Sequence, residues 1–435
     1  MKHPKISILI PVYNAESSIN QCIESVLTQP MSELEIICIN DGSTDDSLKV
    51  LEEYAQKDNR VRIISQPNRG PGVALNIGLR EAKGEFIHFF DSDDFLTENA
   101  YEKAYEILCD NNLDYLKVKA HPVDAFTGAP IAGAIADKYA LAMMSHEDYI
   151  KPISFAQSPE KFTKSPVFAP WSGIYRRSFL IENNVRFSEL YAFADHLFYY
   201  GAASHAERVL AAEIYILYHR MNNSNSLVGS YLNRFGDHFK SYNEIQKYCR
   251  FLPQKAQSMI LSSELESIFL WYHKMLSGGD AKKARWMMSE FVRSTDVSSF
   301  DEMCKNALWY LEYQMILHNI TDEKPEISHA ENTEFIEEIR KRIPQTVGAI
   351  QPCSRVIIYG AGTYGQRIFR LLKSSRFCDI VLVVDKNWEK LLRDDMPVAS
   401  PDSIAKTVYD HILIAAENPK SAHEMRRLCG AAGCL

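Results

Sequence analysis

Three carboxylates lie within four residues, directly after the apolar run Glu85–Phe90. They belong to the cluster Asp91, Ser92, Asp93 and Asp94. Oxygen ligands suit Mg²⁺ and Mn²⁺, and a divalent ion can bridge carboxylates to a diphosphate. A turn and a helix cap would explain each residue singly, but not three carboxylates together. The cluster predicts a metal–diphosphate site, in which one carboxylate holds the ion and another accepts hydrogen bonds from a ribose.

Polar and turn-forming residues also follow three other apolar runs. Asn14 and Thr44 alone would pass as helix caps, and Asn68 and Gly70 as turn residues. Four such loops in one segment favour a common ligand, and glycine lets the backbone approach it closely. The predicted donor-binding residues are Pro11, Tyr13, Asn14 and Glu16 in the first loop, Asp41 in the second, Asn68, Arg69, Gly70 and Asn76 in the third, and Asp91 and Ser92 in the fourth.

The elements that must position these loops alternate between strand and helix. Helical periodicity marks Glu16–Gln29 and Asp45–Lys57. Such alternation predicts a mostly parallel sheet covered by helices, an α/β fold whose ligands bind at the carboxyl ends of the strands. The expected strands are Ile6–Ile10, Glu35–Ile39, Val61–Ile64, Glu85–Phe90 and Tyr115–Lys119.

The ordered set of motifs resembles the inverting family 2 glycosyltransferases of GT-A fold. The matching segments are Pro11–Asn14, Asn40–Ser47, Asn68–Gly70 with Ala74–Leu79, and Asp91–Asp94. The resemblance implies a nucleoside-diphosphate sugar donor, usually UDP-linked, held with Mn²⁺ or Mg²⁺. It further implies that Asp41 and Asp91 lie at the nucleoside and that Asp93 binds the metal.

The resemblance continues through Pro170–Leu180, Asn183–Phe187 and Ala194–His196. It implies an acceptor side at Trp171 and Arg176, and Asp195 as the general base that removes the acceptor's proton. The alternative is that Asp195 caps a helix over Leu197–Ala203. Two residues depart from the family. Ala194 replaces an acidic residue, and Leu75 replaces an arginine that faces the diphosphate. Two alternatives would compensate for the missing arginine: Arg69 substitutes for it, or the metal carries more of the charge.

A histidine follows a further strand-like run, Ile214–Leu217. In some relatives a histidine here completes the metal site, which predicts His219 as a ligand; a surface histidine in an aromatic loop is the equal alternative. The polar stretch Asn222–Ser226 after it predicts a loop that closes over the donor. Tyr191 and Phe193 are expected in the core.

The C-terminal part returns to the alternating pattern after a helical middle. Gly360, Gly362 and Gly365 follow the strand Val356–Tyr359 and open a helix, and Asp385 ends the strand Asp379–Val384. This context is typical of nucleotide-binding loops, although the same glycines also serve close strand–helix packing. The unit resembles the small Rossmann-like domains of bacterial polysaccharide-assembly proteins, which implies a nucleotide ligand.

Length and charge set the remaining expectations. The 435 residues predict a GT-A domain at 1–229, a helical region at 230–345 and a small Rossmann-like domain at 350–435, with a linker near Thr321–Asn332 and a helix over Glu334–Arg342. The net charge of −8 argues against a nucleic-acid partner. No signal peptide or membrane span is evident, which predicts a cytoplasmic protein. The helical region contains four basic residues, Arg234, Lys240, Lys247 and Arg250. They either contact anionic lipid at the inner membrane face or form a solvated surface.

These observations predict a metal-dependent inverting glycosyltransferase. Its donor would be a UDP-sugar, and its acceptor a glycan or glycolipid of a bacterial surface polysaccharide. Two alternatives stay open. One is a nucleotide-sugar oxidoreductase or epimerase built on the C-terminal unit. The other is a non-catalytic assembly protein that binds nucleotide sugar, which Ala194 and Leu75 make conceivable.

Overall fold

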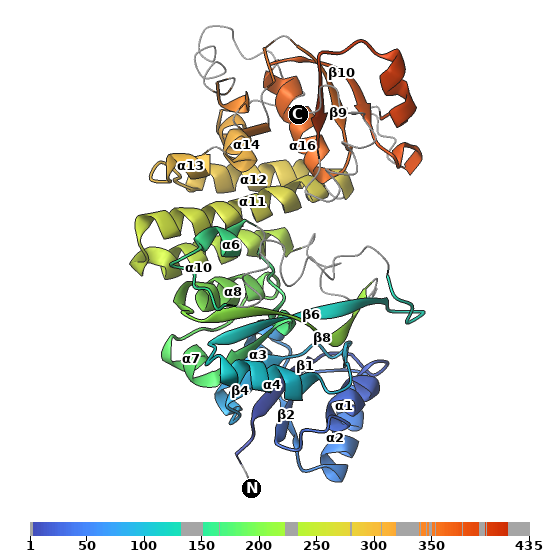
Figure 1. Cartoon of the computed structure of the whole chain (residues 1–435), viewed down its shortest axis with the longest axis vertical. Coiled ribbons are helices and arrows are strands. Elements are labelled where there is room, and N and C mark those ends of the chain that lie inside the picture. The colour runs from blue at the N-terminus through green and yellow to red at the C-terminus, as the bar shows by residue number, and fades with distance from the viewer. Residues whose placement is uncertain are drawn as a thin grey trace. The chain divides into compact units, whose positions relative to one another are not determined.

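Two compact units, Met1–Ser263 and Glu264–Leu435, make up the chain in the computed structural model (Figure 1). The structure describes residues 3–131, 151–164, 166–221, 234–278, 281–305, 307–318, 339, 341–344, 346–347, 350–352, 354–375, 377–390, 396 and 398–415. The predicted loop Asn222–Ser226, the linker Thr321–Asn332 and most of the helix Glu334–Arg342 lie outside these ranges. The three-domain division remains a prediction.

The first unit contains an eight-stranded sheet in the order β3-β2-β1-β4-β7-β6-β8-β5. The four strands at the β3 end are parallel, and β7 joins β4 and β6 antiparallel to both. The strands are β1 Ile6–Val12, β2 Leu34–Asn40, β3 Val61–Ser65, β4 Phe86–Phe89, β5 Phe95–Leu96, β6 Tyr115–Asp124, β7 Gly173–Arg176 and β8 Val209–Met221. This mostly parallel sheet confirms the predicted α/β class.

Helices cover both faces of this sheet because its strands are apolar on both sides. Ile8 and Ile10 of β1 share one core with Cys22 and Leu108, from the helices of that face. On the other face, a Cβ added at Gly78 would lie 2.9 Å from the Ile39 side chain, so that helix packs closely on β2. The helices of this half are α1 Ile19–Leu27, α2 Ser47–Lys57, α3 Pro71–Glu81 and α4 Ala100–Asp110.

The rest of the first unit is mainly helical. The sequence led us to expect a helix from Leu197, but it begins at Ala194, after Phe193 in a left-handed conformation with φ 60°. Asp195 therefore lies inside the first helical turn rather than at the cap. The elements are α6 Pro159–Thr163, η2 Pro170–Ser172, α7 Arg177–Glu182, α8 Ala194–His205, α10 Phe235–Tyr248, η4 Cys249–Phe251 and α11 Gln254–Gly278, which continues into the second unit.

The second unit combines helices with a three-stranded parallel sheet in the order β10-β9-β11. Arg367 is fully buried there and forms ion pairs with Glu312 and Glu266. The elements are α12 Ala281–Ser294, α13 Glu302–Lys305, α14 Leu308–Leu317, β9 Arg355–Tyr359, α16 Thr363–Ser375, β10 Asp379–Val384, η5 Trp388–Lys390, η6 Pro401–Lys406 and β11 His411–Ile414. Across the described ranges, every helix is too short or too polar to cross a membrane.

Candidate active site

The first two strand-end loops are tied to each other by side chains predicted to bind the donor. The Oδ1 of Asn14 accepts a hydrogen bond from the backbone N–H of Thr44 at 2.8 Å. The Oε2 of Glu16 accepts one from Asp46 N–H at 3.0 Å. The helix α1 begins at Ile19, three residues after the start at Glu16 that the sequence pattern suggested. Tyr13, which precedes Asn14, exposes 45% of its surface.

Asp41 organises the third loop. Its buried carboxylate accepts hydrogen bonds from Gln66 Nε2 at 2.5 Å, Arg69 N–H at 2.9 Å and Gly70 N–H at 2.8 Å. Gly70 has φ 88°, a conformation that favours glycine. The carboxylate thereby fixes the backbone of the loop that contains Asn68, which is exposed.

The buried carboxylate of Asp94, the half-buried carboxylate of Asp91 and an imidazole meet beyond β4. Ligand atoms of Asp91, Asp94 and His219 all lie within 4.8 Å of one another. His219 Nδ1 is 2.8 Å from Asp94 Oδ2, across 125 residues of sequence. The described structure thus brings the predicted ligand His219 to the acidic cluster.

The negative charges of the aspartates in this cluster lie close together and repel one another. Burial, together with the charges of Asp94 and Asp93, raises the pKa of Asp91 well above its usual range. Burial lowers the pKa of His219, but the charge and hydrogen bond of Asp94 outweigh it and raise the pKa to about 9. A cation would relieve this crowding, and two carboxylates with one imidazole suit Mn²⁺ or Mg²⁺. The donor set therefore fits a divalent metal.

Asp94 and Arg220 are site residues that the sequence prediction did not assign. The Arg220 N–H donates to Asp94 Oδ1 at 2.9 Å, and its guanidinium donates to the Asp93 carbonyl and to Gln21. Both residues were visible in the motifs, since Asp94 ends the acidic cluster and Arg220 follows His219. Their pairing depends on the contact between β5 and β8, which no local pattern predicts. Arg220 thus holds the backbone of the cluster in place.

Trp171 lies against the same cluster. Its ring stacks on His219, with 4.6 Å between centroids and 29° between planes. Its carbonyl is 3.0 Å from Nε2 of the buried His88, whose Nδ1 is 2.9 Å from the Tyr101 hydroxyl. Trp171 is itself buried, so in this structure it supports His219.

Asp195 lies close enough to the cluster for its charge to contribute to the raised pKa of Asp91. The preceding Ala194 is buried against α3, where a Cβ added at Gly72 would lie 2.8 Å from the Ala194 Cβ. The tight contact between α3 and α8 gives a packing reason for alanine at this departure from the family. Leu75, the other departure, is buried on α3.

Two predicted residues make structural contacts instead. Asn76 exchanges hydrogen bonds with the backbone of Phe187, at 3.0 and 2.9 Å. Arg176 pairs with Phe86, at the amino end of β4, and its guanidinium contacts Glu85 and the Leu113 carbonyl. The structure does not bring Arg176 to the acidic cluster, which lies at the carboxyl end of β4.

Three further residues, Arg69, Pro11 and Ser92, were predicted to bind the donor. Arg69 is exposed and lies 3.6 Å from Glu189, while Pro11 belongs to β1 and Ser92 is half-buried. Phe193 is buried, as expected of a core residue, and Tyr191 packs against Gly70.

The glycine loop of the second unit connects β9 to α16. A Cβ added at Gly365 would lie 1.8 Å from the Gly360 carbonyl oxygen, so Gly365 serves close strand–helix packing. At Gly362 an added Cβ would meet nothing within 4 Å. The Asp385 carboxylate accepts hydrogen bonds from Ala361 N–H at 2.9 Å and Asn387 N–H at 2.8 Å. Asp385 thereby fixes the loop backbone.

Sequence comparisons match two families. Residues 7–183 match the family described as glycosyl transferase family 2, and residues 353–426 match the family described as C2185-like, N-terminal. A glycosyltransferase of Escherichia coli K12, described as the uncharacterized YibD, is 33% identical over 184 residues, 42% of this chain and 52% of YibD. The poly(ribitol-phosphate) beta-glucosyltransferase of Bacillus spizizenii is 31% identical over 49% of this chain and 32% of that protein. The chain thus covers about half or less of these relatives.

Structural comparison finds a solved protein of similar fold. Staphylococcus aureus TarS 1–349 in complex with UDP superposes with a TM-score of 0.53 and 20% identity, over 72% of this chain and 86% of TarS 1–349. At that identity the likeness shows a shared fold. Residues 7–183 are thus similar to family 2 glycosyltransferases, and the chain shares a fold with TarS 1–349.

Proposed function

We propose that the protein is a metal-dependent inverting glycosyltransferase that transfers a sugar from a UDP-sugar to an acceptor hydroxyl. The observation that carries the proposal is the group of Asp91, Asp94 and His219, with Asp195 within electrostatic range. This group lies past the carboxyl end of β4, where ligands of such sheets bind. The UDP part of the proposal is supported by TarS, a protein of the same fold solved with UDP.

In this proposal the first loops and Asp41 shape the nucleoside side of the site. Asp41 and Asp91 are proposed to face the nucleoside, and the 66–70 loop fixed by Asp41 to approach it. Asp91, Asp94 and His219 are proposed to hold Mn²⁺ or Mg²⁺, with Asp93 as the further ligand that the family resemblance implies. When bound, the ion supplies positive charge where the leaving diphosphate builds up negative charge.

Asp195 is proposed as the general base. An inverting transfer needs one base that removes the proton of the acceptor hydroxyl as the hydroxyl oxygen attacks the anomeric carbon. The carboxylate lies in the first turn of α8, where the positive end of the helix dipole favours the ionised form. An ionised carboxylate is the form that can accept the proton.

The acceptor is proposed to be a glycan or glycolipid of a bacterial surface polysaccharide. The relative that glucosylates poly(ribitol-phosphate) supports this class, and Trp171 remains the acceptor-side residue of the proposal. A cytoplasmic location with contact to the inner membrane face is also proposed. Of the basic residues concerned, Lys240 pairs with Asp237 and Arg234 lies over Tyr191.

The test is a donor assay with purified protein. UDP-sugars are incubated with and without Mn²⁺ and a panel of acceptors, and released UDP and new glycan are measured. We expect metal-dependent UDP release. Binding of UDP-sugars without turnover under any metal would favour the non-catalytic alternative. A spectral change with NAD and a UDP-sugar would favour the oxidoreductase alternative.

A nucleotide at the loop of Gly360, Gly362 and Gly365 is a second, separate proposal. The open space at Gly362 supports it, because a ligand can approach the backbone there. Binding of a fluorescent nucleotide, lost on Gly362→Val, is the expected outcome.

A further inference from the structure

The turn between α10 and α11 exposes an aromatic side chain to solvent. Phe251 exposes 95% of its surface, the largest exposed fraction of any large hydrophobic residue among those that the structure describes. It lies in η4, which directly follows the end of α10 at Tyr248. Single exposed apolar residues are common on protein surfaces, so the surroundings of Phe251 decide whether the ring has a partner.

Three exposed cations flank Phe251 along the chain. Lys247 lies in the last turn of α10, Arg250 directly precedes Phe251, and Lys255 lies in the first turn of α11. Across the described ranges, the ion pairs do not include any of these three cations. Residues 245–263 contain no Asp or Glu, although the whole chain has a net charge of −8. The turn is therefore a locally positive surface on an acidic protein.

Hydrogen bonds of the turn itself keep the Phe251 ring in solvent. The Leu252 N–H donates to the Cys249 carbonyl at 2.9 Å, and Gln257 Nε2 donates to the Leu252 carbonyl at 2.7 Å. Cys249 is fully buried and anchors the inner side of the turn. The exposure of Phe251 thus follows from the shape of the turn, two residues after a core residue.

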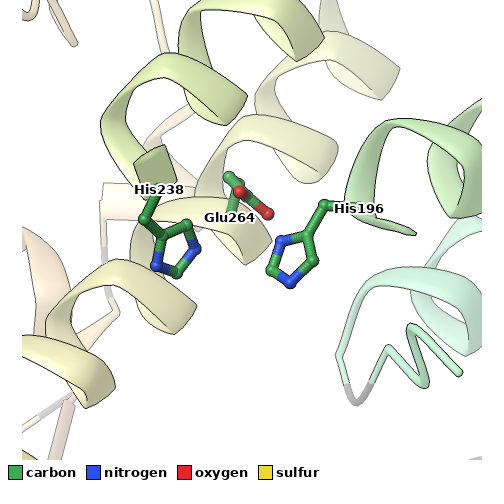
Figure 2. A group of neighbouring side chains, drawn as sticks. All are labelled: His196, His238 and Glu264. Carbon is green, nitrogen blue, oxygen red and sulfur yellow. The ribbon is translucent and has the colours of Figure 1, made fainter. Parts of the chain in front are cut away.

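The opposite side of α10 is already covered by the protein. Figure 2 shows His238 of α10 beside His196 of α8, and the two ring centroids lie 5.1 Å apart. Tyr242 and Ile245, further along α10, are buried as well. A partner would therefore contact the exposed side of this helix and the turn that follows it.

Two other basic residues that were predicted to contact lipid have contacts within the protein. Lys240 lies 2.8 Å from the Asp237 carboxylate, and the Arg234 guanidinium lies 3.9 Å from the centre of the Tyr191 ring. A neighbouring carboxylate cancels much of the attraction between a lysine and an anionic surface. The positive charge that can meet an anionic partner is therefore concentrated at residues 247–255.

We propose that residues 247–255 bind the surface of an anionic lipid bilayer. Phe251 would insert at the boundary between headgroups and acyl chains, and Lys247, Arg250 and Lys255 would contact lipid phosphates. An apolar ring among basic residues is the composition of interfacial membrane contacts. A two-fold contact with a second copy would bring identical cations together, which disfavours self-association through this surface. The inference rests on the proposed membrane contact and not on the proposed sugar transfer.

The test is co-sedimentation of the full chain with vesicles, without donor or metal. Wild-type protein should bind vesicles of equal parts phosphatidylglycerol and phosphatidylcholine, but not phosphatidylcholine alone, and added salt should weaken binding. Phe251→Ala should bind at least about tenfold more weakly, because the apolar ring is lost. The double variant Lys247→Gln, Lys255→Gln should bind about 25-fold more weakly, at about fivefold for each cation. Phe126→Ala, at a phenylalanine with 76% exposure in another turn, and Lys240→Gln are the matched controls and should bind as the wild type does.

Each outcome of this experiment either supports or overturns the inference. Melting temperatures equal to that of the wild type show that the variants fold. Wild-type protein that binds neither kind of vesicle would overturn the proposal. Binding kept in Phe251→Ala and in the double lysine variant, but lost in Lys240→Gln, would overturn this inference and leave the proposed membrane contact standing elsewhere. Dimers in analytical ultracentrifugation that dissociate in Phe251→Ala would assign the surface to a second copy instead. UDP release by the same preparations tests the proposed transfer separately.

Discussion

Asp94 and His219 show how single residues determine the charge of the acidic cluster. Their 2.8 Å contact raises the pKa of His219 to about 9, so His219 carries a proton at neutral pH in the metal-free protein. Asp94 also accepts a hydrogen bond from Arg220 N–H, so its carboxylate is fixed on both oxygens. A metal that binds here would replace a proton as the partner of the carboxylates of Asp91 and Asp94.

Asp195→Asn is predicted to separate catalysis from donor binding. Asparagine keeps the shape of the side chain but cannot accept the acceptor's proton, so kcat should fall by ~10²–10⁴-fold while the affinity for UDP stays the same. Initial-rate kinetics and calorimetry on the same preparation measure both quantities. Glu182→Gln, a change at an exposed carboxylate at the end of α7, is the control and should leave kcat unaltered. Unaltered turnover in Asp195→Asn would rule out its role as the base.

Sequence motifs predicted those residues of the acidic cluster that come directly after a strand. Asp91 and Asp93 follow a strand directly, and His219 follows another. The structural uses of Asn76 and Arg176 could not be predicted, because Asn76 contacts Phe187, 111 residues away, and Arg176 contacts Glu85, 91 residues away.

At the scale of elements, the second unit contains a buried ionic network between helices. Arg367 of α16 contacts Glu312 of α14 and Glu266 of α11, and His273 of α11 lies 2.7 Å from Glu312. Burial opposes the charge on Glu312, but Arg367 and His273 outweigh it and lower its pKa from 4.5 to about 2. Arg367 is the main counter-charge, because burial lowers the pKa of His273 and keeps it largely neutral.

The network predicts how the stability of the second unit depends on pH. Glu312 has a lower pKa in the folded chain than in the unfolded chain, so its contribution is complete above pH 4.5 and is lost as pH falls towards about 2. Urea unfolding followed by fluorescence between pH 7 and pH 3 should show a falling free energy of unfolding. Glu312→Gln should be less stable at pH 7, by about 3–5 kcal/mol, because Arg367 loses a buried partner. A pH slope below 4.5 that is equal in both proteins would contradict this account.

Strand and helix periodicity predicted most elements of the first sheet, because the apolar runs of β1, β2 and β4 are buried on both faces. The strand β7 was not predicted. Its four residues, Gly173–Arg176, fall in a segment recognised by its motif and not by alternation, and its pairing with β4 and β6 is long-range. The start of α8 was placed three residues late because Phe193 occupies the cap in a left-handed conformation.

At the scale of the whole molecule, the chain has one unit with the donor cluster and another with the glycine loop. The family 2 match ends at residue 183 and the second match begins at residue 353, so the helical region between them has no family assignment. The length of the chain suggested several domains, and the polar stretch Thr321–Asn332 predicted a linker between two of them. The two units instead divide at Ser263, which lies within the continuous helix α11.

The two units are predicted to respond separately to substitution. Gly365→Ala places a Cβ 1.8 Å from the Gly360 carbonyl and should loosen β9 and α16, whereas Gly362→Ala meets nothing within 4 Å and is the matched control. Hydrogen exchange should rise over residues 354–375 in Gly365→Ala alone. UDP affinity with Mn²⁺ should be equal in both variants and the wild type, because the donor cluster lies in the other unit. Loss of UDP binding in Gly365→Ala would contradict separate units.

The claim that the acidic cluster is a metal–diphosphate site is tested most directly by calorimetric titration of UDP with and without Mn²⁺. Wild-type protein should bind UDP measurably tighter with Mn²⁺. Asp93→Ala and Asp94→Asn should lose this gain, while Asp46→Asn, a change at the exposed aspartate that precedes α2, should retain it. Equal affinity of the wild type for UDP with and without Mn²⁺ would contradict the account.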